Sequence, residues 1–377
     1  MTKDTPILIT GAQGFVGKNL FAHLKNAGYT ALDLYDRDTP PEKLREYAAR
    51  AGFVYHLAGV NRPQNPTEFY AGNTDLTENL LALLEEAGNT CPVLLCSSIQ
   101  AELDNDYGKS KRNAETLLFS HEQSTGAPAL VYRLPGLFGK WCRPNYNSVI
   151  ATFCHNAACG LPLTVRDPAY AFTVAYIDDV IGDFIAALSG AAVRDMSIPG
   201  FCHLTKAYDT TLGFLAETIE GFAKKRLALE IPNMADPLIK KLYSTFLSYL
   251  PPEGGFKYPL NTHTDSRGNF TEFIRTPDRG QTSVSVTHPG VVRGNHWHHT
   301  KNEKFLVVQG QGVVRFRKIG ERAVYKYFVS GEKLEVIDIP TGYTHNIENL
   351  GDGDLITIMW ANEPFDPAAP DTYFEEV

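Results

Sequence analysis

The first two-thirds of the chain alternates short apolar runs with longer segments of helical spacing. Apolar runs stand at residues 6–9 (PILI), 53–59 (FVYHLAG) and 92–98 (PVLLCSS). Segments such as KNLFAHLKNAG then place apolar residues three and four positions apart, as an amphipathic helix does. Strands that alternate with helices form a parallel sheet covered by helices. This part therefore predicts an α/β, doubly wound domain of the Rossmann type.

The last third of the chain has a different pattern. Short β-type runs recur (FTEFI, TSVSVT, EKFLVVQG, GVVRFRKI, VYKYFV, KLEVIDI, LITIMWA), and turn signals such as DSRGN and NLGDGD separate them. This pattern is typical of a small all-β barrel. Residues 209–250 look helical, and a Pro- and Gly-rich stretch, PPEGGFKYP, follows. We therefore predict an α/β domain over 1–250 and an all-β domain over 251–377.

Composition and charge narrow the classes of partner. The 377 residues are 43% hydrophobic and 21% charged with a net charge of -8, which argues against nonspecific binding of nucleic acid. We expect no membrane partner, because no apolar run reaches the 18 residues that a membrane span needs. The six cysteines are irregularly spaced and the start of the chain lacks the pattern of a secretory signal. A reduced, cytoplasmic setting is therefore expected.

A glycine-rich turn follows the first apolar run. In GAQGFVG, Gly11, Gly14 and Gly17 stand between a predicted strand and a predicted helix. Glycines let the backbone approach a pyrophosphate, and the helix start offers free N–H groups to it. The residues predicted to bind a dinucleotide are these three glycines, Phe15 and Val16 within the turn, and Leu57 and Ala58 at the end of the third apolar run.

The end of the second predicted strand bears on which cofactor binds. A carboxylate there holds a ribose 2′-hydroxyl, and an arginine holds a 2′-phosphate. Asp36 and Arg37 are adjacent in LYDR, and Asp33 within the strand is a further candidate. We favour Arg37 and therefore NADPH.

A tyrosine and a lysine four residues apart follow the fourth apolar run. Tyr107 and Lys111 share one face of a predicted helix, and Ser98 ends the preceding strand. A lysine ammonium beside a phenol is expected to lower the phenol pKa, which would let Tyr107 exchange protons near neutrality. Ser98 would orient a substrate carbonyl. Asn73 is equally compatible with a helix N-cap and with a catalytic role.

These motifs together resemble the extended short-chain dehydrogenase/reductase family. The resemblance implies that Tyr107, Lys111 and Ser98 transfer a proton while a nicotinamide transfers a hydride, often on a nucleotide sugar. The segment VYRLPGLFGKWCRPNYNSV is similar to the loop that follows the catalytic helix in that family. Its candidate contacts to substrate are Arg143, Asn145 and Asn147. Arg133, Asp178 and Asp179 are interpreted as structural.

The last third carries a candidate metal site. His296 and His298 are two residues apart, so on a strand they point to one face, and Glu303 and His345 follow. Three imidazoles and one carboxylate suit a divalent ion such as zinc, manganese, iron or nickel, and we predict zinc. The spacing from Gly290 to Gly310 and the run from Pro340 to Asn349 resemble the two cupin motifs, although the glycine before Pro340 is displaced. His299 is out of phase with the pair, whereas Lys304 and Tyr343 are candidate acids or bases.

The whole chain resembles the bifunctional CapF/WbjC enzymes of capsular polysaccharide and O-antigen synthesis, through stretches such as SRGNFTEFIRTPDRGQ and GNHWHHTKNEKFLVV. The resemblance implies that the cupin domain epimerises C3 of UDP-2-acetamido-2,6-dideoxy-β-L-arabino-4-hexulose. The reductase domain would then reduce C4 with NADPH to UDP-N-acetyl-6-deoxy-L-talosamine, a precursor of UDP-N-acetyl-L-fucosamine. It also implies a homodimer formed through the cupin domain.

Two other hypotheses keep the reductase and change the role of the cupin. In one, the cupin is a metal-dependent oxygenase or isomerase for another sugar, and turnover without O2 would separate an oxygenase from an epimerase. In the other, the cupin is a dimerisation module with a structural metal.

Overall fold

The computed structural model describes residues 1–377, which divide into two compact units. The first consists of Met1–Glu220 with Pro237–Leu250, and the second of Gly221–Asp236 with Pro251–Val377. The chain crosses from the first unit to the second after Leu250, which is where the sequence placed the domain boundary. Residues 221–236, which the sequence-based division left in the first domain, group with the second unit.

The first unit is built on a six-stranded parallel sheet with the order β2-β1-β3-β4-β5-β8. Its strands are β1 (Ile7–Thr10), β2 (Leu32–Tyr35), β3 (Phe53–His56), β4 (Val93–Ser98), β5 (Ala129–Leu134) and β8 (Phe201–Cys202). A smaller sheet contains β6 (Gly136–Phe138), β7 (Ala171–Tyr176) and β9 (Tyr208–Thr211). The strand order reverses direction between β1 and β3, and open α/β sheets bind ligands at such a switch point.

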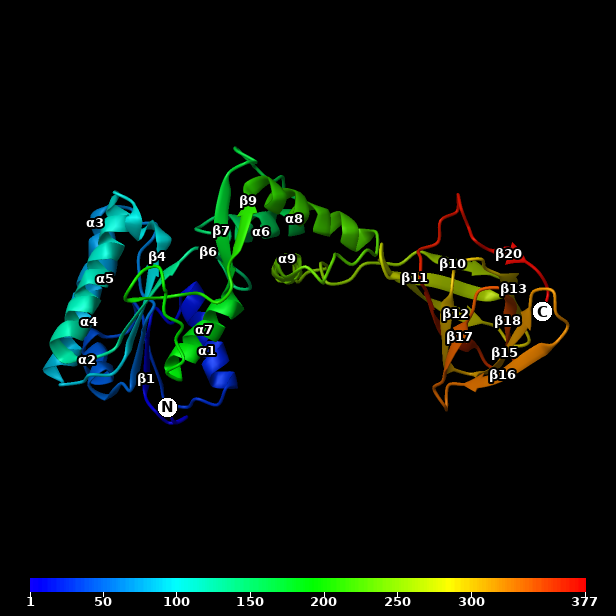
Figure 1. Ribbon diagram of the computed structural model, residues 1–377, viewed down its shortest axis with the longest axis horizontal. Coiled ribbons are helices and arrows are strands. Elements are labelled where there is room, and N and C mark those ends of the chain that lie inside the picture. Colours follow the sequence, from blue (N-terminus) through cyan, green and yellow to red (C-terminus); the bar gives the residue numbers. More distant parts are fainter. The chain divides into compact units, whose positions relative to one another are not determined.

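Helices cover both faces of the parallel sheet, as the doubly wound prediction requires (Figure 1). On one face lie α1 (Phe15–Asn26) and α7 (Ile177–Leu188), and on the other lie α2 (Pro41–Arg50), α4 (Leu76–Glu86) and α5 (Asp106–Thr125). The other helices of the chain are α3 (Thr67–Phe69), α6 (Val149–Ala158), α8 (Leu212–Leu227) and α9 (Pro237–Leu247), with a π-helix over Tyr70–Asp75 and a 3-10 helix over Ile99–Glu102. One apolar core lies between the sheet and α1 and α7, and a second lies beneath α2, α4 and α5. These two layers hold the ends of β1, β3 and β4 in fixed positions.

Residues 209–250, which the sequence pattern predicts to be helical, are helical only in part. The segment begins in strand β9 and contains two helices, α8 and α9, instead of one. The chain leaves the helical path at Leu229, whose φ is 63°, and Pro232 and Pro237 follow. Proline lacks the N–H that a continuing helix needs.

The second unit is an antiparallel β structure of two sheets, as expected for a cupin barrel. The first sheet has the order β10-β11-β12-β19-β14-β17 and the second β16-β15-β18-β13-β20. The strands are β10 (Thr262–Asp265), β11 (Gly268–Thr276), β12 (Gly280–Thr287), β13 (Val292–Trp297), β14 (Glu303–Gln309), β15 (Gln311–Lys318), β16 (Val324–Ser330), β17 (Val336–Ile339), β18 (Tyr343–Asn349), β19 (Leu355–Ala361) and β20 (Tyr373–Phe374). Residues such as Phe305, Val314 and Ile347 fill the space between the sheets.

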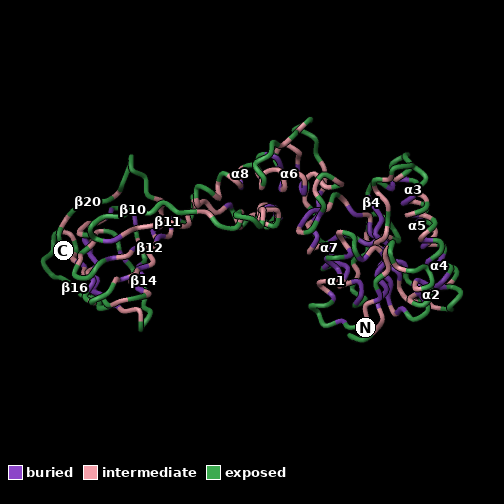
Figure 2. The backbone as a smooth tube through the Cα atoms, turned by 180° about the vertical axis from the view of Figure 1, so that it is seen from behind, coloured by how far each residue is buried: buried purple, intermediate pink, exposed green.

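Burial follows the same division (Figure 2). Buried residues concentrate along the parallel strands of the first unit and on the facing sides of the two sheets of the second. All six cysteines are free thiols, which agrees with the expected absence of a disulfide framework. No helix combines the length and the apolar character that a bilayer crossing demands.

Candidate functional site

The glycine-rich turn joins β1 to α1, and its geometry requires glycine. Gly11 has a φ of 69°, and a Cβ atom there would lie 2.7 Å from the Cα atom of Ala58. A Cβ on Gly17 would lie 2.3 Å from the carbonyl oxygen of Gly11. The turn is therefore pressed against the end of β3 and against the first turn of α1, which leaves its outer side open.

A cleft of about 870 Å³ lies over this turn at the carboxyl ends of β1, β3 and β4. Most of the predicted cofactor residues line it, namely Gly11, Gly14, Phe15, Val16, Gly17, Leu57 and Lys111. Ala58 does not line the cleft; instead its backbone packs on Gly11, and its N–H donates to the Thr10 hydroxyl at 3.2 Å. The volume is in the range of cavities that hold small-molecule ligands.

The three charged candidates at the end of β2 are in different environments. Asp36 accepts the backbone N–H of Gln13 at 2.8 Å, which ties it to the glycine-rich turn. Asp33 is paired with Arg50 on α2 and is therefore not available to a ribose. Arg37 is exposed, and neither a hydrogen bond nor an ion pair of its guanidinium occurs in the structure.

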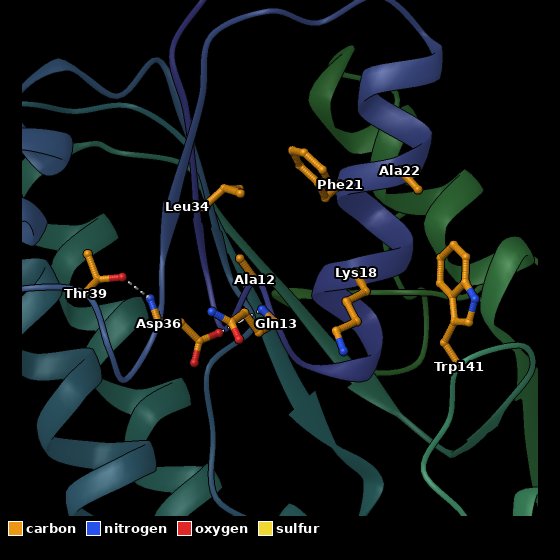
Figure 3. Close-up of a pocket in the computed structure, with 9 residues that line it drawn as sticks. All are labelled: Ala12, Gln13, Lys18, Phe21, Ala22, Leu34, Asp36, Thr39 and Trp141. Carbon is orange, nitrogen blue, oxygen red and sulfur yellow. Dashed lines mark hydrogen bonds between the residues drawn. The ribbon is translucent and has the colours of Figure 1, made fainter.

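A second cavity of about 590 Å³ adjoins the cleft and is drawn in Figure 3. Asp36 and Gln13 lie on one side of α1, Trp141 lies on the other, and Lys18 projects from the helix between them. Gln13, Lys18 and Trp141 line both cavities. The space available to a ligand therefore extends past the start of α1.

Tyr107, Lys111 and Ser98 meet on the wall of the cleft. The Asn105 side chain caps the start of α5 by accepting the Gly108 N–H at 2.8 Å, which places Tyr107 in the first turn. Lys111 is buried one turn later, and its Nζ donates to the Cys96 carbonyl at 3.1 Å. Tyr107, Lys111 and Ser98 all line the same cleft.

The pKa of Tyr107 differs from the expectation. Burial raises the pKa of this phenol, and the Ser98 hydroxyl offsets only part of the rise. Lys111 does not lower it, because the ammonium is directed to the Cys96 carbonyl and burial lowers the pKa of the lysine itself. The prediction of a lowered tyrosine pKa is therefore wrong for the chain alone.

Asn73 is not the helix N-cap that the sequence suggested as one of its two roles. It lies in the π-helix, is 2% exposed, and does not cap α4. Its side chain bonds both the N–H and the carbonyl of Val60, each at 3.0 Å, and donates to the Ser110 hydroxyl at 2.9 Å. It thus clamps the loop after β3 to α5.

The loop after β6 supplies another wall of the cleft. Arg143 and Asn147 line the cleft as expected, but Asn145 does not. Asn145 has a φ of 54° and donates its backbone N–H to the Thr152 hydroxyl at 2.9 Å, so it shapes the turn. Tyr146, which the sequence analysis missed, lines the cleft with the Arg143 guanidinium 5.3 Å from its ring.

Charged residues around this loop are paired with one another. Arg133 bonds Glu115 at 2.7 Å, and Asp178 contacts Lys140 and His23. Asp179 pairs with Lys241 on α9. These pairs agree with the structural roles that the sequence suggested for Arg133, Asp178 and Asp179.

In the second unit, four side chains gather between the two sheets. His296 lies on β13 directly opposite His345 on β18, His298 follows β13, and Glu303 begins β14. One ligand atom from each of the four lies within 4.8 Å of the others. Glu303 Oε2 is 3.3 Å from His345 Nε2 and 3.6 Å from His298 Nε2.

Three of the four residues in this cluster point metal-binding atoms at one another without hydrogen-bond partners. His298 Nε2, His345 Nε2 and Glu303 Oε2 are buried, and none of them has a partner. Buried polar atoms without partners are rare, because each forfeits its hydrogen bond to water. Converging imidazole nitrogens and a carboxylate oxygen fit the ligand set of a divalent metal such as zinc.

The electrostatics favour the metal-binding forms of His296 and Glu303, but not that of His298. Burial, followed by the neighbouring His345, lowers the pKa of His296 to about 4. Burial alone would raise the pKa of Glu303, but contacts with His298 and His345 lower it. The pKa of His298 is raised, because Glu303 outweighs the effect of burial. A neutral imidazole and an ionised carboxylate are the forms that bind metal ions.

Two neighbouring residues lie outside the cluster. The His299 ring contacts those of Trp297 and Tyr373, with centroid separations of 4.4 and 4.9 Å. Lys304 is exposed and ion-paired with Asp338.

Comparison with protein families matches both units. Residues 7–196 match the NAD dependent epimerase/dehydratase family, and residues 263–373 match the polysaccharide biosynthesis C-terminal domain. These ranges contain, respectively, the cleft with Tyr107 and the four-residue cluster.

Full-length relatives are also found. The chain is 43% identical to a Pseudomonas aeruginosa protein named UDP-2-acetamido-2,6-beta-L-arabino-hexul-4-ose reductase, over 97% of each chain. The crystal structure of the capsular polysaccharide assembling protein CapF from Staphylococcus aureus is 48% identical, with a TM-score of 0.92 over 98% of this chain and 100% of that one. The Bordetella bronchiseptica enzyme WbmF, solved in complex with NAD+, is 19% identical over 59% of this chain and 79% of its own, with a TM-score of 0.51, and shares the fold.

Proposed function

Because this chain belongs to the family of CapF and the UDP-2-acetamido-2,6-beta-L-arabino-hexul-4-ose reductase, we propose that it is a bifunctional nucleotide-sugar enzyme of polysaccharide biosynthesis. The second unit epimerises C3 of UDP-2-acetamido-2,6-dideoxy-β-L-arabino-4-hexulose, and the first unit reduces the C4 ketone. The product is UDP-N-acetyl-6-deoxy-L-talosamine. The observation that carries the proposal is the presence, in one chain, of a dinucleotide cleft with Tyr107 on its wall and a four-residue metal cluster.

The reduction takes place in the cleft of the first unit. NADPH, when bound over the glycine-rich turn, supplies the hydride to C4. Tyr107 donates the proton to the ketone oxygen, and its raised pKa keeps the phenol protonated and ready to donate. Lys111 and Ser98 position Tyr107 and the ketone so that the proton can be transferred between them. Arg143 and Asn147 contact the diphosphate or the sugar.

Arg37 selects the phosphorylated cofactor. Arg37 is exposed next to Asp36, just after the end of β2, where an arginine can accommodate a 2′-phosphate, although it does not line either cavity. An arginine holds phosphate with paired N–H donors, and Arg37 has no competing partner within the chain. The Asp36 carboxylate, in contrast, already accepts a hydrogen bond from the Gln13 N–H.

The epimerisation takes place at the cluster of the second unit. His296, His298, Glu303 and His345 hold one divalent ion, which we assign as zinc; when bound, it polarises the C4 ketone as a Lewis acid. The C3 proton is acidic because the adjacent ketone stabilises the carbanion as an enolate. Stabilising such charge is typically worth a few kcal/mol, or about 10²–10³ in rate.

The second unit is also the site of homodimer formation. Strand β16 is the edge of its sheet, and it exposes Val324, Tyr325, Tyr327 and Phe328, the last by 71%. Exposed apolar edge strands invite pairing with another chain. A second copy would cover this strand.

Proton NMR of the ketosugar in D2O, with and without NADPH, tests the two activities separately. Without NADPH, the signal of H3 should disappear by exchange while the ketone persists; with NADPH, the C4 alcohol should form. Removal of the metal by a chelator should stop the exchange and leave reduction of an already epimerised ketosugar intact. Exchange that continues in the metal-free, folded protein would reduce the metal to a structural role, and turnover that stops without O2 would indicate an oxygenase.

A further inference from the structure

We propose that the last residues of the chain form a strap, residues 371–376, that positions the metal ligand His298, and that Asp371 is the positioning residue. This inference rests on the metal site of the proposed function and extends it beyond the four ligands. The evidence for it is that Asp371 contacts the metal site through two of its groups, the side-chain carboxylate and the backbone carbonyl.

The carboxylate of Asp371 holds the turn that connects His298 to Glu303. It accepts the backbone N–H groups of His299, Thr300 and Lys301 at 2.9, 2.8 and 2.9 Å, and the Thr300 hydroxyl at 3.0 Å. Three consecutive N–H groups directed at one carboxylate fix the path of the backbone between them. The spacing between two metal ligands is thereby set by a residue from the far end of the sequence.

The carbonyl of Asp371 fixes the proton on His298. It lies 2.5 Å from His298 Nδ1, and because a carbonyl can only accept, Nδ1 must carry the hydrogen. In a neutral imidazole the lone pair is then on Nε2. That atom is the one that lies 3.6 Å from Glu303 Oε2 without a hydrogen-bond partner. A hydrogen-bond acceptor on the ring nitrogen that does not bind the metal orients a histidine ligand and strengthens its bond to the metal.

The rest of the strap is fastened to β13, which carries His296, and to β15. Strand β20 pairs with β13 at His296 and Trp297, and the Glu375 N–H donates to the Asn295 carbonyl at 3.0 Å. Arg317 on β15 bonds the Glu375 carboxylate at 2.7 Å. The barrel therefore holds the strap on the C-terminal side of Asp371, within four residues of its contact with His298.

Zinc affinity tests the inference with Asp371→Ala and a matched control, Asp366→Ala. Asp366 is in the same C-terminal stretch, but its carboxylate bonds only within its own turn, to the Ala368 N–H at 2.9 Å. Each metal-free protein is titrated with zinc against a chromophoric chelator, after circular dichroism has shown that it is folded. Asp371→Ala should bind zinc about 10–100-fold more weakly, and Asp366→Ala should match the wild type.

Equal zinc affinity in the two variants would overturn the role of the strap. A wild-type chain that binds no zinc would instead overturn the metal site of the proposed function, so the two failures are distinguishable. If Asp371→Ala does not fold, the wild-type metal-free protein decides the question. Its ¹⁵N NMR spectrum, with the His298 signals identified by their loss in His298→Gln, should show a hydrogen on Nδ1, and a ring whose Nδ1 carries no hydrogen would refute the inference.

Discussion

Replacing Gly17 with alanine should destabilise the first unit, whereas the same change at Gly182 should stabilise it. Both glycines are in helices, α1 and α7, where alanine is favoured by about 0.5–1 kcal/mol. A Cβ at Gly182 meets nothing within 4 Å. A Cβ at Gly17 would stand 2.3 Å from the Gly11 carbonyl oxygen and 2.7 Å from the Ala12 Cα atom, well inside the 3.4 Å at which ordinary contact begins.

The size of the effect follows from what the new methyl group meets. Overpacking costs about 1–3 kcal/mol, and the upper part of that range applies because backbone atoms cannot rotate away. After the gain in helix propensity, Gly17→Ala should lose about 1–2 kcal/mol while Gly182→Ala gains about 0.5–1 kcal/mol. The Gly11 turn must also move, so Gly17→Ala alone should weaken NADPH binding.

Urea unfolding followed by ellipticity at 222 nm measures the difference. This signal reports the first unit, because every helix except the end of α8 belongs to it. The NADPH dissociation constant is measured on the same samples. If both variants shift the unfolding midpoint in the same direction, the close approach of Gly17 to Gly11 does not constrain the turn and the reasoning is refuted.

Four further outcomes are expected. Tyr107→Phe should slow NADPH oxidation by about 10²–10⁴-fold and leave H3 exchange intact; loss of both in a folded, zinc-loaded protein would contradict the division of labour. Because burial raises the pKa of Tyr107 above its usual value of 10.0, the phenol stays protonated and kcat for reduction should be flat from about pH 7 to pH 9, whereas a fall centred near pH 8 would contradict this assignment. Arg37→Ala should weaken NADPH binding by about 10–100-fold and spare NADH, and equal loss of both cofactors would exclude the 2′-phosphate contact. Phe328→Glu should convert a dimer into a monomer in light scattering after gel filtration, and a variant that stays dimeric would place the interface elsewhere.

The glycine-rich turn and the wall of the cleft could be predicted from sequence in part. The motif GAQGFVG stands between an apolar run and a helical segment. The strand and the helix that define this turn are its neighbours in the sequence, so the sequence pattern alone predicts it. The position of Asn145 outside the cleft lining was not foreseen, because its residue type does not reveal its positive φ, and its backbone N–H donates to Thr152. Tyr146 was missed because an aromatic residue in a loop has no periodic signal.

The metal cluster was foreseeable for a different reason. His296 and His298 have the period of a strand, and their motif fixes the distance to Glu303. The strap was not foreseeable, because Asp371 contacts His299 across 72 residues of sequence and no spacing relates the two. The raised pKa of Tyr107 was also missed, since it depends on burial and on which acceptor Lys111 reaches.

The chemistry of the proposed function explains why the two activities share one chain. Epimerisation at C3 requires the C4 ketone, because only the ketone makes the C3 proton acidic. Reduction removes that ketone, so it also ends any further exchange at C3 and fixes the configuration then present. An epimerase alone would leave a mixture set by equilibrium, and a reductase alone would reduce whichever epimer it met. Under the proposed function, the selectivity of the cleft lined by Tyr107 for one epimer would determine the product, and the metal cluster would replenish that epimer as it is consumed. This order predicts that H3 exchange precedes reduction and that adding NADPH late to an exchanged mixture still yields a single C3 epimer.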